Sequence, residues 1–391
     1  MKLLINTQSI RYPMTGIGNY TANLLAEYSK DPLFESIQCY DGNCWVNVSD
    51  QILLESKSHK AYFNDKPLAD AGQKVRSLIR SIPGAYPIKS WINNHRFRNV
   101  NTKGAVYHEP NIILKPLSVP SVVTIHDLSF FKYPGFHPKE RIRWMMGNIH
   151  KTLHQADQVI VDSDVVRQDL LEFCPIDEGK LKTIHLGVDS QLFRHVEQPR
   201  LVQDLARYRL SNQKYVLFVG TIEPRKGLSL LLDAWISMSA QDKGDYIVVV
   251  AGSQGWHNAD IMQKIQLLSS QNSLKYLSYV PAKDLASLYS GAVCFVYPSF
   301  YEGFGLPVLE AMSCGSPVLV AKGTAMEEFI GEAGLVFDNG SHESLGYQLT
   351  HLLTNSMLRH KMSLSGMRLA RNLSWKRCAD ITASTYKKVL S

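Results

Sequence analysis

The chain has 391 residues, of which 45% are hydrophobic and 20% charged, with a formal net charge of +7. This is ordinary globular composition at a length that favours two domains, and no apolar run reaches the roughly 18 residues that a bilayer-spanning helix needs. The opening sequence MKLLINTQSI lacks the apolar centre of a signal peptide, and the six cysteines are scattered without a zinc-binding pattern. We therefore expect a cytoplasmic protein with reduced thiols.

Short apolar runs rich in β-branched residues alternate with helical segments along the chain, which is typical of parallel sheets with helices on both faces. The polar segment 189–213 indicates a linker, and the residues after Asn372 predict a last amphipathic helix. The fold class is therefore α/β, with two domains that meet near residue 200, and the cleft between them is the expected ligand site. In chain order, the clearest predicted strands are residues 3–6, 105–108, 122–126, 158–162, 215–220, 246–251, 274–277, 294–297, 317–321 and 335–337.

The segment YPMTGIGNYTANLLAEY, residues 12–28, predicts a glycine turn followed by a helix. Gly16 and Gly18 would let backbone N–H groups approach an anion at the positive end of that helix. A nicotinamide-binding turn is disfavoured because Thr21 stands where the dinucleotide fingerprint needs a third glycine. Two interpretations stay open, a phosphate-binding loop and a plain loop with a helix N-cap.

Residues 71–103 contain basic residues but no Asp or Glu, and apolar residues are interleaved with them. Such a mixture suits an interfacial helix that leans on anionic lipid headgroups, and an ordinary pair of solvated helices fits it equally well. Nucleic acid is a less favoured partner because no nucleic-acid-reading motif accompanies the patch. The residues predicted to contact a membrane or an acceptor are Lys74, Arg76, Arg80, Lys89, Trp91, Arg96 and Arg98.

The run VVTIHDLSFF, residues 122–131, ends an apolar strand with His126 and Asp127. A side chain at the carboxyl end of such a strand projects toward the cleft, where an imidazole can bond a sugar hydroxyl or an oxyanion. The pair makes a poor metal site because adjacent residues of a strand point to opposite faces. A buried histidine with satisfied hydrogen bonds is the competing interpretation.

The run YVLFVGTIEPRKGLSLLLDAW, residues 215–235, leads from a strand through a proline-containing loop to a helix. It places Arg225 and Lys226 together at the entrance of the helix, where two cations suit a diphosphate. The order of residues is not that of a P-loop. A solvated surface pair is the alternative, but the position at a strand end favours a functional role.

The run YEGFGLPVLEAMSCG, residues 301–315, carries Glu302 on a glycine loop and Glu310 in the helix that follows. Pro307 fits the first turn of that helix, so residues 303–306 would form a turn whose N–H groups face the cleft. Two acids could be the proton donor and nucleophile of a glycoside hydrolase, or both could accept hydrogen bonds from the hydroxyls of a sugar and a ribose. The presence of Arg225 and Lys226 favours the second interpretation, because a hydrolase has no need of a diphosphate clamp.

In this order, the phrases TGIGNY, YHEPN, VVTIHDLSF, ADQVIVDSDVVRQDL, FVGTIEPRKGL and VYPSFYEGFGLPVLEAMSCGSPVL resemble the retaining glycosyltransferases of family 4. The resemblance extends over most of the chain, and the spacing of Glu302 and Glu310 before Ala-Met-Ser-Cys-Gly is quite specific. It implies the GT-B fold, in which two Rossmann-like domains face each other across a cleft. The implied parts are an acceptor-binding domain over residues 1–195, a nucleotide-sugar-binding domain over residues 196–372, and a C-terminal helix, residues 373–391, that packs back toward the first domain.

The resemblance also implies roles for single residues. The loop from Gly16 to Gly18 would lie near the donor diphosphate or the acceptor. Glu310 would bind the ribose. The residues expected to take part in catalysis are His126 as a contact to the transferred sugar, Arg225 and Lys226 as the diphosphate clamp, and Glu302 beside the sugar. The turn that would contact the donor through its backbone N–H groups consists of Gly303, Phe304, Gly305 and Leu306.

The chain departs from the family pattern at two places. Thr221 stands where many relatives carry an arginine, which leaves the clamp one cation fewer. Glu327 and Glu328 stand where the family usually has Pro-Glu, so the role of Glu328 is open.

The phrases GTIEPRK and TIHDLSF are similar to a bacterial subgroup that includes O-antigen mannosyltransferases. This implies a metal-independent enzyme without cofactors that moves mannose from GDP-mannose to a lipid-linked saccharide in O-antigen, capsule or exopolysaccharide synthesis. Its expected place is the inner face of the cytoplasmic membrane, with other glycosyltransferases of the pathway as partners. A UDP-sugar donor, a nucleotide-sugar 2-epimerase and a non-catalytic saccharide-binding protein are the alternatives.

Overall fold

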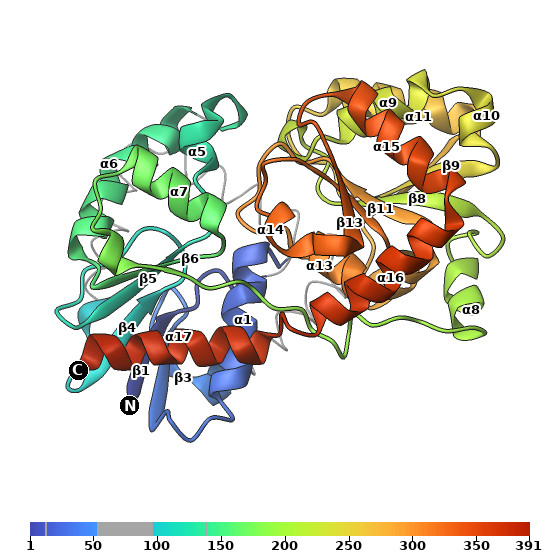
Figure 1. Cartoon of the computed structure of the whole chain (residues 1–391). Helices are drawn as coiled ribbons and strands as arrows, with labels where there is room; N and C mark the ends of the chain where they lie inside the picture. Colours follow the sequence, from blue (N-terminus) through green and yellow to red (C-terminus); the bar gives the residue numbers. More distant parts are fainter. Residues whose placement is uncertain (12–13, 53–96, 138) are drawn as a thin grey trace.

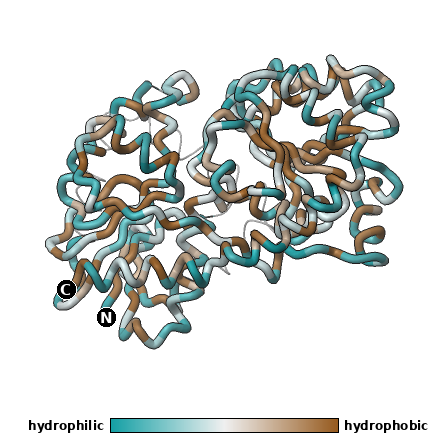
Figure 2. The backbone as a smooth tube through the Cα atoms, in the orientation of Figure 1, coloured by the Kyte–Doolittle hydropathy of each residue, from teal (hydrophilic) through white to brown (hydrophobic). Residues whose placement is uncertain are grey.

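The computed structural model describes residues 1–11, 14–52, 97–137 and 139–391, which form two α/β halves (Figure 1). Each half is built around a mainly parallel sheet whose strands are short and largely buried. The brown, hydrophobic stretches of the tube in Figure 2 are concentrated in these strands. The expected α/β architecture, with one sheet in each half of the described chain, is confirmed.

In the described residues, the N-terminal sheet has the strand order β3-β2-β1-β4-β5-β6-β7. Neighbouring strands are parallel except β2 and β3, which pair in antiparallel fashion at one edge. The strands are β1 (Lys2–Asn6), β2 (Ser36–Tyr40), β3 (Trp45–Asn47), β4 (Ala105–Glu109), β5 (Ser121–Ile125), β6 (Gln158–Val161) and β7 (Leu181–Thr183), and the helices are α1 (Gly16–Tyr28), α5 (Ser129–Lys132), α6 (Lys139–Gln155) and α7 (Asp164–Phe173). The sequence pattern does not predict β2, β3 or β7, because these short strands lie toward the sheet edges and carry polar residues.

The C-terminal sheet is parallel throughout and has the order β10-β9-β8-β11-β12-β13. Its strands are β8 (Lys214–Val219), β9 (Tyr246–Ala251), β10 (Leu274–Ser278), β11 (Cys294–Tyr297), β12 (Val318–Ala321) and β13 (Gly334–Phe337). All six were expected from the sequence, within a residue or so at either end. The helices of this half and its continuation are α8 (Arg200–Ala206), α9 (Leu228–Ser237), α10 (Ala240–Lys243), α11 (Ala259–Ser270), α12 (Ala282–Gly291), α13 (Leu306–Ser313), α14 (Glu327–Ile330), α15 (His342–Thr354), α16 (Ser356–Ala370) and α17 (Trp375–Leu390).

The described chain passes between the halves twice, and the two passages touch. The backbone N–H of Val188 donates to the carbonyl of Leu373 (3.0 Å), and Val188 forms a β-bridge with Ser374. A Cβ atom on Gly187 would lie 2.1 Å from the backbone nitrogen of Trp375, so only glycine permits this approach. Across the described residues, no helix has the length and apolar character needed to cross a bilayer.

After the second passage, α17 runs back across the N-terminal half and contacts α1, β4 and β5 (Figure 1). The expected return of the C-terminal helix is therefore confirmed, while the domain boundaries proposed at residues 195/196 and 372/373 stay predictions. The hydroxyl of Tyr386 lies 2.6 Å from His108 Nδ1 and 3.3 Å from the hydroxyl of Tyr28, and His108 Nε2 lies 2.8 Å from Thr124 Oγ1. Burial lowers the pKa of His108 to about 3, so the ring is neutral and its Nδ1 can accept a hydrogen bond from the Tyr386 hydroxyl.

We expect Tyr386→Phe to lower the free energy of unfolding by about 1–3 kcal/mol, because it leaves a buried nitrogen of His108 without its partner. Denaturant unfolding followed by circular dichroism measures the change. Tyr347→Phe is the control, since Tyr347 is 75% exposed and should show no loss. Equal stability of the two variants would show that α17 is not anchored through this hydroxyl.

Candidate functional site

The loops that follow β8 and β11 lie together at the carboxyl edge of the C-terminal sheet. The first loop contains η3 (Pro224–Lys226), and the carbonyl of Arg225 accepts hydrogen bonds from the backbone N–H of Phe300 (3.0 Å) and the hydroxyl of Ser299 (3.1 Å) in the second loop. The loops meet because β8 and β11 are parallel neighbours and end at the same edge. Two motifs that are far apart in the sequence therefore form one site.

Glu302 lies at the centre of this site. Its Oε1 atom is 2.6 Å from Lys226 Nζ and 3.3 Å from Arg225 Nη1, and it accepts a hydrogen bond from the hydroxyl of Ser299 (2.6 Å). Lys226 Nζ also donates to the hydroxyl of Tyr297 (2.8 Å). We name Arg225, Lys226 and Glu302 the Glu302 cluster. The sequence motifs predict that the three residues share a site, but not that the cations pair with Glu302.

The charges of the Glu302 cluster support one another. Burial disfavours the charged form of each group, but Lys226 and Arg225 outweigh it and lower the pKa of Glu302 to about 2. Likewise, burial opposes the charge on both cations, and the attraction of Glu302 outweighs it and raises the pKa of each. The three side chains are only 12–15% exposed. The cluster therefore keeps two cations charged where little water reaches them.

Glu223 is an acid of this site that the sequence analysis did not single out. Its Oε1 atom lies 3.0 Å from Arg225 Nη2, and its side chain is 4% exposed. Burial raises its pKa, and the nearby cations only partly offset this. Its place in the loop after β8, two residues before Arg225, was the signal available in the sequence.

The turn over residues 303–306 joins the Glu302 cluster to the N-terminal half. A Cβ atom on Gly303 would lie 1.6 Å from the backbone oxygen of His126, so only glycine lets this loop approach the end of β5. α13 begins at Leu306 with Pro307 in its first turn, as expected. The first N–H groups of a helix have no partner within it and can bind an anion or a hydroxyl. Contacts of Gly303, Phe304, Gly305 and Leu306 with a donor stay predictions.

His126 is buried, and both of its ring nitrogens are engaged. Nδ1 lies 2.7 Å from Asp162 Oδ2, and Nε2 lies 2.9 Å from the carbonyl oxygen of Pro110. Burial lowers the pKa of His126, but the Asp162 carboxylate outweighs it and raises the pKa overall. The geometry matches the interpretation as a satisfied buried histidine. For the ring to contact a sugar directly, one of these two hydrogen bonds would have to break. The contact between His126 and a sugar stays a prediction.

Asp162 is the partner of His126 that the sequence analysis missed. Ile125 of β5 pairs in register with Val161 of β6, which places the next residues, His126 and Asp162, side by side. This adjacency follows from strand order, which the sequence pattern does not give.

Asp162 and Asp164 have the Asp-x-Asp spacing of some metal sites, but their carboxylates have different partners. Asp162 contacts His126, and Asp164 Oδ1 accepts a hydrogen bond from the Thr183 hydroxyl (2.6 Å). In the part of the chain that the structure describes, no group of three or more His, Cys, Asp and Glu side chains could hold a metal ion. Whether the reaction is metal-independent stays a prediction.

Glu310 lies in α13, outside the Glu302 cluster. Its Oε2 atom accepts a hydrogen bond from the hydroxyl of Tyr289 (3.1 Å) in α12. Burial raises the pKa of Glu310 to about 7, and the Tyr289 hydroxyl only partly offsets the shift. The two glutamates therefore differ, since one is firmly ionised and the other titrates near neutral pH.

The glycine turn before α1 has the geometry of a helix N-cap. The Thr15 hydroxyl accepts a hydrogen bond from the backbone N–H of Gly18 (3.3 Å). A Cβ atom on Gly18 would lie 2.7 Å from the carbonyl oxygen of Ser9, whereas one on Gly16 would meet no atom within 4 Å. Gly18 thus serves local packing, and binding of a donor or acceptor at this loop stays a prediction.

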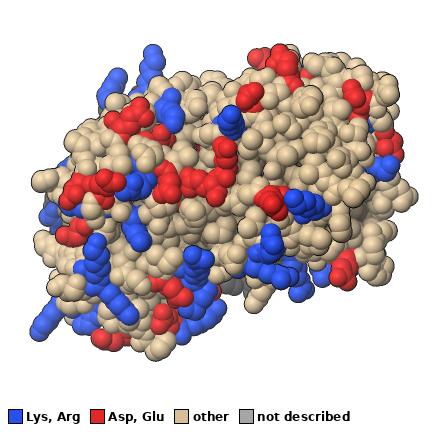
Figure 3. All heavy atoms as spheres, viewed as in Figure 1, with Lys and Arg blue, Asp and Glu red and all other residues tan. Residues whose placement is uncertain are grey.

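The predicted basic patch falls largely outside the described residues. Of its members Arg98 is described, and its side chain is exposed. Figure 3 shows basic and acidic side chains interspersed over the visible face of the N-terminal half. The members that lie outside the described residues are Lys74, Arg76, Arg80, Lys89, Trp91 and Arg96.

Glu328 connects the two halves. Its carboxylate oxygens accept hydrogen bonds from the backbone N–H groups of Asp164 (3.0 Å) and Val165 (2.7 Å), and Oε2 lies 3.2 Å from His185 Nε2. Asp164 and Val165 begin α7, so the carboxylate also faces the positive end of that helix. The role of Glu328 that the sequence left open is therefore, in this structure, a cap across the interface.

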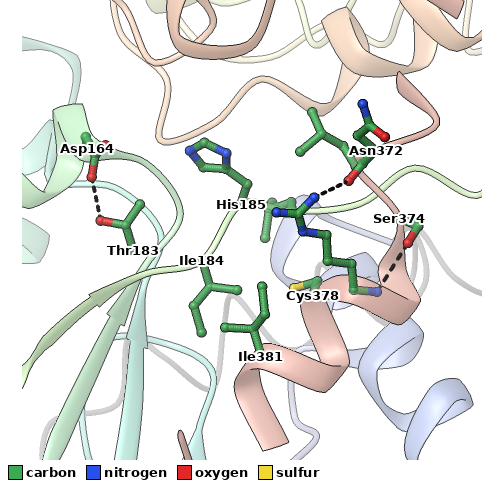
Figure 4. Close-up of a pocket in the computed structure, with 11 residues that line it drawn as sticks. Asp164, Thr183, Ile184, His185, Asn372, Ser374, Cys378 and Ile381 are labelled. Carbon is green, nitrogen blue, oxygen red and sulfur yellow. Dashed lines mark hydrogen bonds between the residues drawn. The ribbon is translucent and has the colours of Figure 1, made fainter. Parts of the chain in front are cut away.

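A cavity of about 290 Å³ lies beside this contact, where the chain passes between the halves. Its walls come from Asp164, residues 183–186, residues 372–374, Arg377, Cys378 and Ile381 (Figure 4). Ile184, Cys378 and Ile381 contribute apolar surface. The cavity borders His185 and so the Glu328 contact, and no residue of the Glu302 cluster lines it.

Comparison with known proteins finds relatives along the whole chain. Residues 204–367 match the family model described as glycosyl transferases group 1, and residues 66–192 match the model described as glycosyltransferase family 4. The O-antigen chain mannosyltransferase B of Escherichia coli is 31% identical over 388 residues, which cover 99% of this chain and 100% of the relative.

Solved structures share the fold at low sequence identity. Sucrose-phosphate synthase from Thermosynechococcus elongatus has a TM-score of 0.70 and 18% identity, covering 100% of this chain and 99% of that one. HepE from Anabaena, solved in complex with UDP and glucose, has a TM-score of 0.67 and 18% identity, covering 99% of this chain and 100% of that one. These similarities support the GT-B fold expected from the sequence.

We expect Glu328→Ala to speed hydrogen exchange of the Asp164 and Val165 amides by about 10-fold or more, because a charge-assisted cap is lost. Amide exchange followed by mass spectrometry measures this. Glu327→Ala is the matched control, since Glu327 Oε2 accepts a bond from the N–H of Gly323 within its own half. Unchanged exchange in Glu328→Ala would show that the cap contributes nothing to holding the halves together.

Proposed function

The chain belongs to the family 4 glycosyltransferases, and on this premise we propose that it transfers mannose from GDP-mannose to a lipid-linked saccharide, with retention of anomeric configuration, in O-antigen synthesis. The observation that carries the proposal is the Glu302 cluster, in which two half-buried cations lie at the carboxyl edge of the C-terminal sheet. The full-length similarity to an O-antigen chain mannosyltransferase supports the choice of sugar and pathway.

In this proposal Arg225 and Lys226 bind the diphosphate of the donor and neutralise the charge that develops as it leaves. Arginine offers a planar pair of donors and lysine a compact charge, and both act more strongly in a water-poor site. Two fixed cations can thus do what a metal ion does in other transferases. The leaving phosphate oxygen takes the proton of the acceptor hydroxyl as that hydroxyl attacks the same face of the sugar.

Donor binding requires the cluster to reorganise. Glu302 offsets part of the charge of Lys226 and Arg225, and the diphosphate of a donor would supply further negative charge to the same cations. When the phosphates take over the cations, the Glu302 carboxylate becomes available to accept hydrogen bonds from sugar hydroxyls. The low pKa of Glu302 suits this role, because an ionised carboxylate accepts but does not donate.

The interface between the halves contributes by excluding water. The contact of Gly303 with the His126 carbonyl and the Glu328 cap hold the N-terminal half close to the Glu302 cluster. A closed cleft favours transfer to a saccharide over hydrolysis of the donor. Contact with the inner face of the cytoplasmic membrane, and with other glycosyltransferases of the pathway, belongs to the proposal because the acceptor is a lipid.

A donor panel tests the proposal. The protein is incubated with GDP-mannose, UDP-glucose and UDP-N-acetylglucosamine, with and without a lipid-linked saccharide, and the anomeric configuration of the product is read by NMR. We expect an α-mannoside that forms only with GDP-mannose and acceptor. Transfer from a UDP-sugar would overturn the assignment of GDP-mannose as donor. Isomerisation of the nucleotide-sugar without acceptor would indicate a nucleotide-sugar 2-epimerase, and the absence of any turnover would indicate a saccharide-binding protein.

Lys226→Ala, Arg225→Ala and Glu302→Ala should each lower kcat for mannosyl transfer by about 100-fold or more, because each change removes a charge at the leaving group or the sugar. Steady-state kinetics with GDP-mannose measure the loss. Lys214→Ala is the control, since Lys214 is a lysine of the same half that is 57% exposed and pairs with Asp245. Near wild-type activity of all three cluster variants would refute the clamp.

Affinity for the nucleotide should rise with pH if Glu310 binds the ribose. Its pKa of about 7 means that it becomes ionised between pH 6 and pH 8, and a carboxylate accepts hydroxyl hydrogen bonds more strongly than a neutral acid. We expect GDP to bind about 5-fold more tightly at pH 8 than at pH 6. Calorimetry at the two pH values measures this, and Glu310→Gln should remove the difference while Glu343→Gln keeps it.

A further inference from the structure

A tyrosine of the C-terminal half is buried against the N-terminal half. Tyr301 immediately precedes Glu302 in the loop after β11, and it is 3% exposed. Its hydroxyl accepts a hydrogen bond from the backbone N–H of Leu128 (3.3 Å). Lys132 Nζ lies 5.6 Å from the centroid of its ring, and the ring of Tyr133 lies 5.8 Å away. The side chain of Tyr301 is therefore seated on α5 and the residues that flank it.

A carboxylate of α7 completes this seat. Asp169 is buried, and its Oδ1 atom lies 2.6 Å from Lys132 Nζ. Burial raises the pKa of Tyr301, and the Asp169 carboxylate raises it further, so the hydroxyl stays protonated. We name Leu128, Lys132, Tyr133 and Asp169 the Tyr301 seat, and all four belong to the N-terminal half. The side chain of Tyr301 thus crosses from one half to the other.

The backbone of Tyr301 holds a cation of the Glu302 cluster. Its carbonyl accepts a hydrogen bond from Arg225 Nη1 (2.8 Å), and the same nitrogen lies 3.3 Å from Glu302 Oε1. The hydroxyl oxygen of Ser299 lies 3.2 Å from this carbonyl oxygen. The guanidinium of Arg225 is therefore oriented by two consecutive residues, and the first of them has its side chain in the Tyr301 seat.

The preceding residue, Phe300, makes the same kind of connection. Its carbonyl accepts a hydrogen bond from the Tyr133 hydroxyl (3.4 Å), and its ring lies 6.3 Å from that of Phe136. Its backbone N–H donates to the carbonyl of Arg225 (3.0 Å). Two neighbouring residues thus contact the N-terminal half on one side and Arg225 on the other. Side-chain packing and single hydrogen bonds make up these contacts between the halves, so they can break while both halves stay folded.

We propose that Tyr301 is a positioning residue that couples closure of the two halves to the orientation of Arg225. The inference rests on the proposed function, in which Arg225 binds the donor diphosphate. When Tyr301 occupies its seat, its carbonyl is fixed, and so is the guanidinium that donates to this carbonyl. When the halves part, the loop after β11 loses that support. The charge on the leaving diphosphate is then fully stabilised only once the N-terminal half has closed.

Tyr301→Phe tests the coupling, because it keeps the ring and removes the hydroxyl. We expect kcat for mannosyl transfer to fall about 10-fold while KM for GDP-mannose changes less than about 2-fold, because the transition state needs the seated form more than donor binding does. Hydrolysis of GDP-mannose relative to transfer should rise about 5-fold, since water is excluded less well. Steady-state kinetics with separation of free mannose from the glycoside product measure both changes.

Tyr246→Phe is the matched control. The Tyr246 hydroxyl donates to the carbonyl of Leu353 within the C-terminal half (3.4 Å), so its loss should leave kcat and the hydrolysis ratio at wild-type values. An unchanged kcat in Tyr301→Phe would overturn the proposal. A raised KM at unchanged kcat would overturn it as well, because Tyr301 would then serve donor binding alone.

Asp169→Ala approaches the Tyr301 seat from the N-terminal half and should give the same pattern as Tyr301→Phe. Because the hydroxyl and the carboxylate act together, the double variant should lose little more kcat than either single variant. Losses that multiply in the double variant would refute a shared role.

Amide hydrogen exchange tests the coupling apart from the reaction. In ligand-free Tyr301→Phe the Leu128 amide loses its acceptor, and the Phe300 amide, which donates to the Arg225 carbonyl, should exchange about 5-fold faster as well. Mass spectrometry with fragmentation that resolves single amides measures both, and Tyr246→Phe should change neither. Unchanged exchange at Phe300 would overturn the coupling even where transfer proceeds. If no donor gives transfer but Phe300 exchanges faster, the proposed function fails while the coupling between Tyr301 and the loop of Arg225 stands.

Discussion

The pairing of Glu302 with Lys226 and Arg225 is the interaction on which the carboxyl edge of the C-terminal sheet depends. Either cation alone would lose several kcal/mol of hydration on burial, and an uncompensated charge at this depth would destabilise the loops that carry it. Glu302 offsets that penalty and, with Ser299, fixes the loop after β11 against the loop after β8. The protein can therefore keep two cations in a water-poor site before any ligand arrives.

The halves are joined by different kinds of contact, and these decide how the site is completed. The close approach of Gly187 to Trp375 holds the two chain passages together, and α17 is anchored in the N-terminal half through Tyr386. On the cleft side, Gly303 lies against the His126 carbonyl, and Glu328 caps α7. The contact at Gly303 and the Glu328 cap can break without unfolding either half, whereas the buried contacts of α17 cannot. This arrangement is expected of halves that open for substrate and close for reaction.

The two halves treat their acids differently. Glu302 is ionised by the cations that it contacts, whereas Glu109 is held by neutral donors and lies near a cation without contacting it, so that burial raises its pKa to about 7. The two cations of the Glu302 cluster therefore share one ionised carboxylate, whereas Glu109 has no cation in contact among the described residues.

The sequence by itself determined the motifs and most of the strands, but not β2, β3 or β7. Alternation of apolar strands and helices predicts two α/β domains, and Pro307 with its preceding glycines predicts the turn and start of α13, because these signals depend on neighbours in the chain. The sequence also indicates Arg225, Lys226 and Glu302 as parts of one site through the family resemblance. It does not indicate that Asp162 contacts His126 or that Glu223 contacts Arg225, and it does not identify the partners of Glu328 and Glu109.

Those partners depend on which strands are neighbours and on how the halves meet. His126 and Asp162 lie side by side because β5 pairs with β6 in register, Asn6 reaches Glu109 because β1 pairs with β4, and Glu328 reaches α7 only across the interface. Each such pair joins residues far apart in the chain, so local sequence patterns do not predict it. The tertiary structure alone decided that Glu302 is the counter-ion of Arg225 and Lys226 and that both ring nitrogens of His126 have partners, because both facts follow from distances between elements.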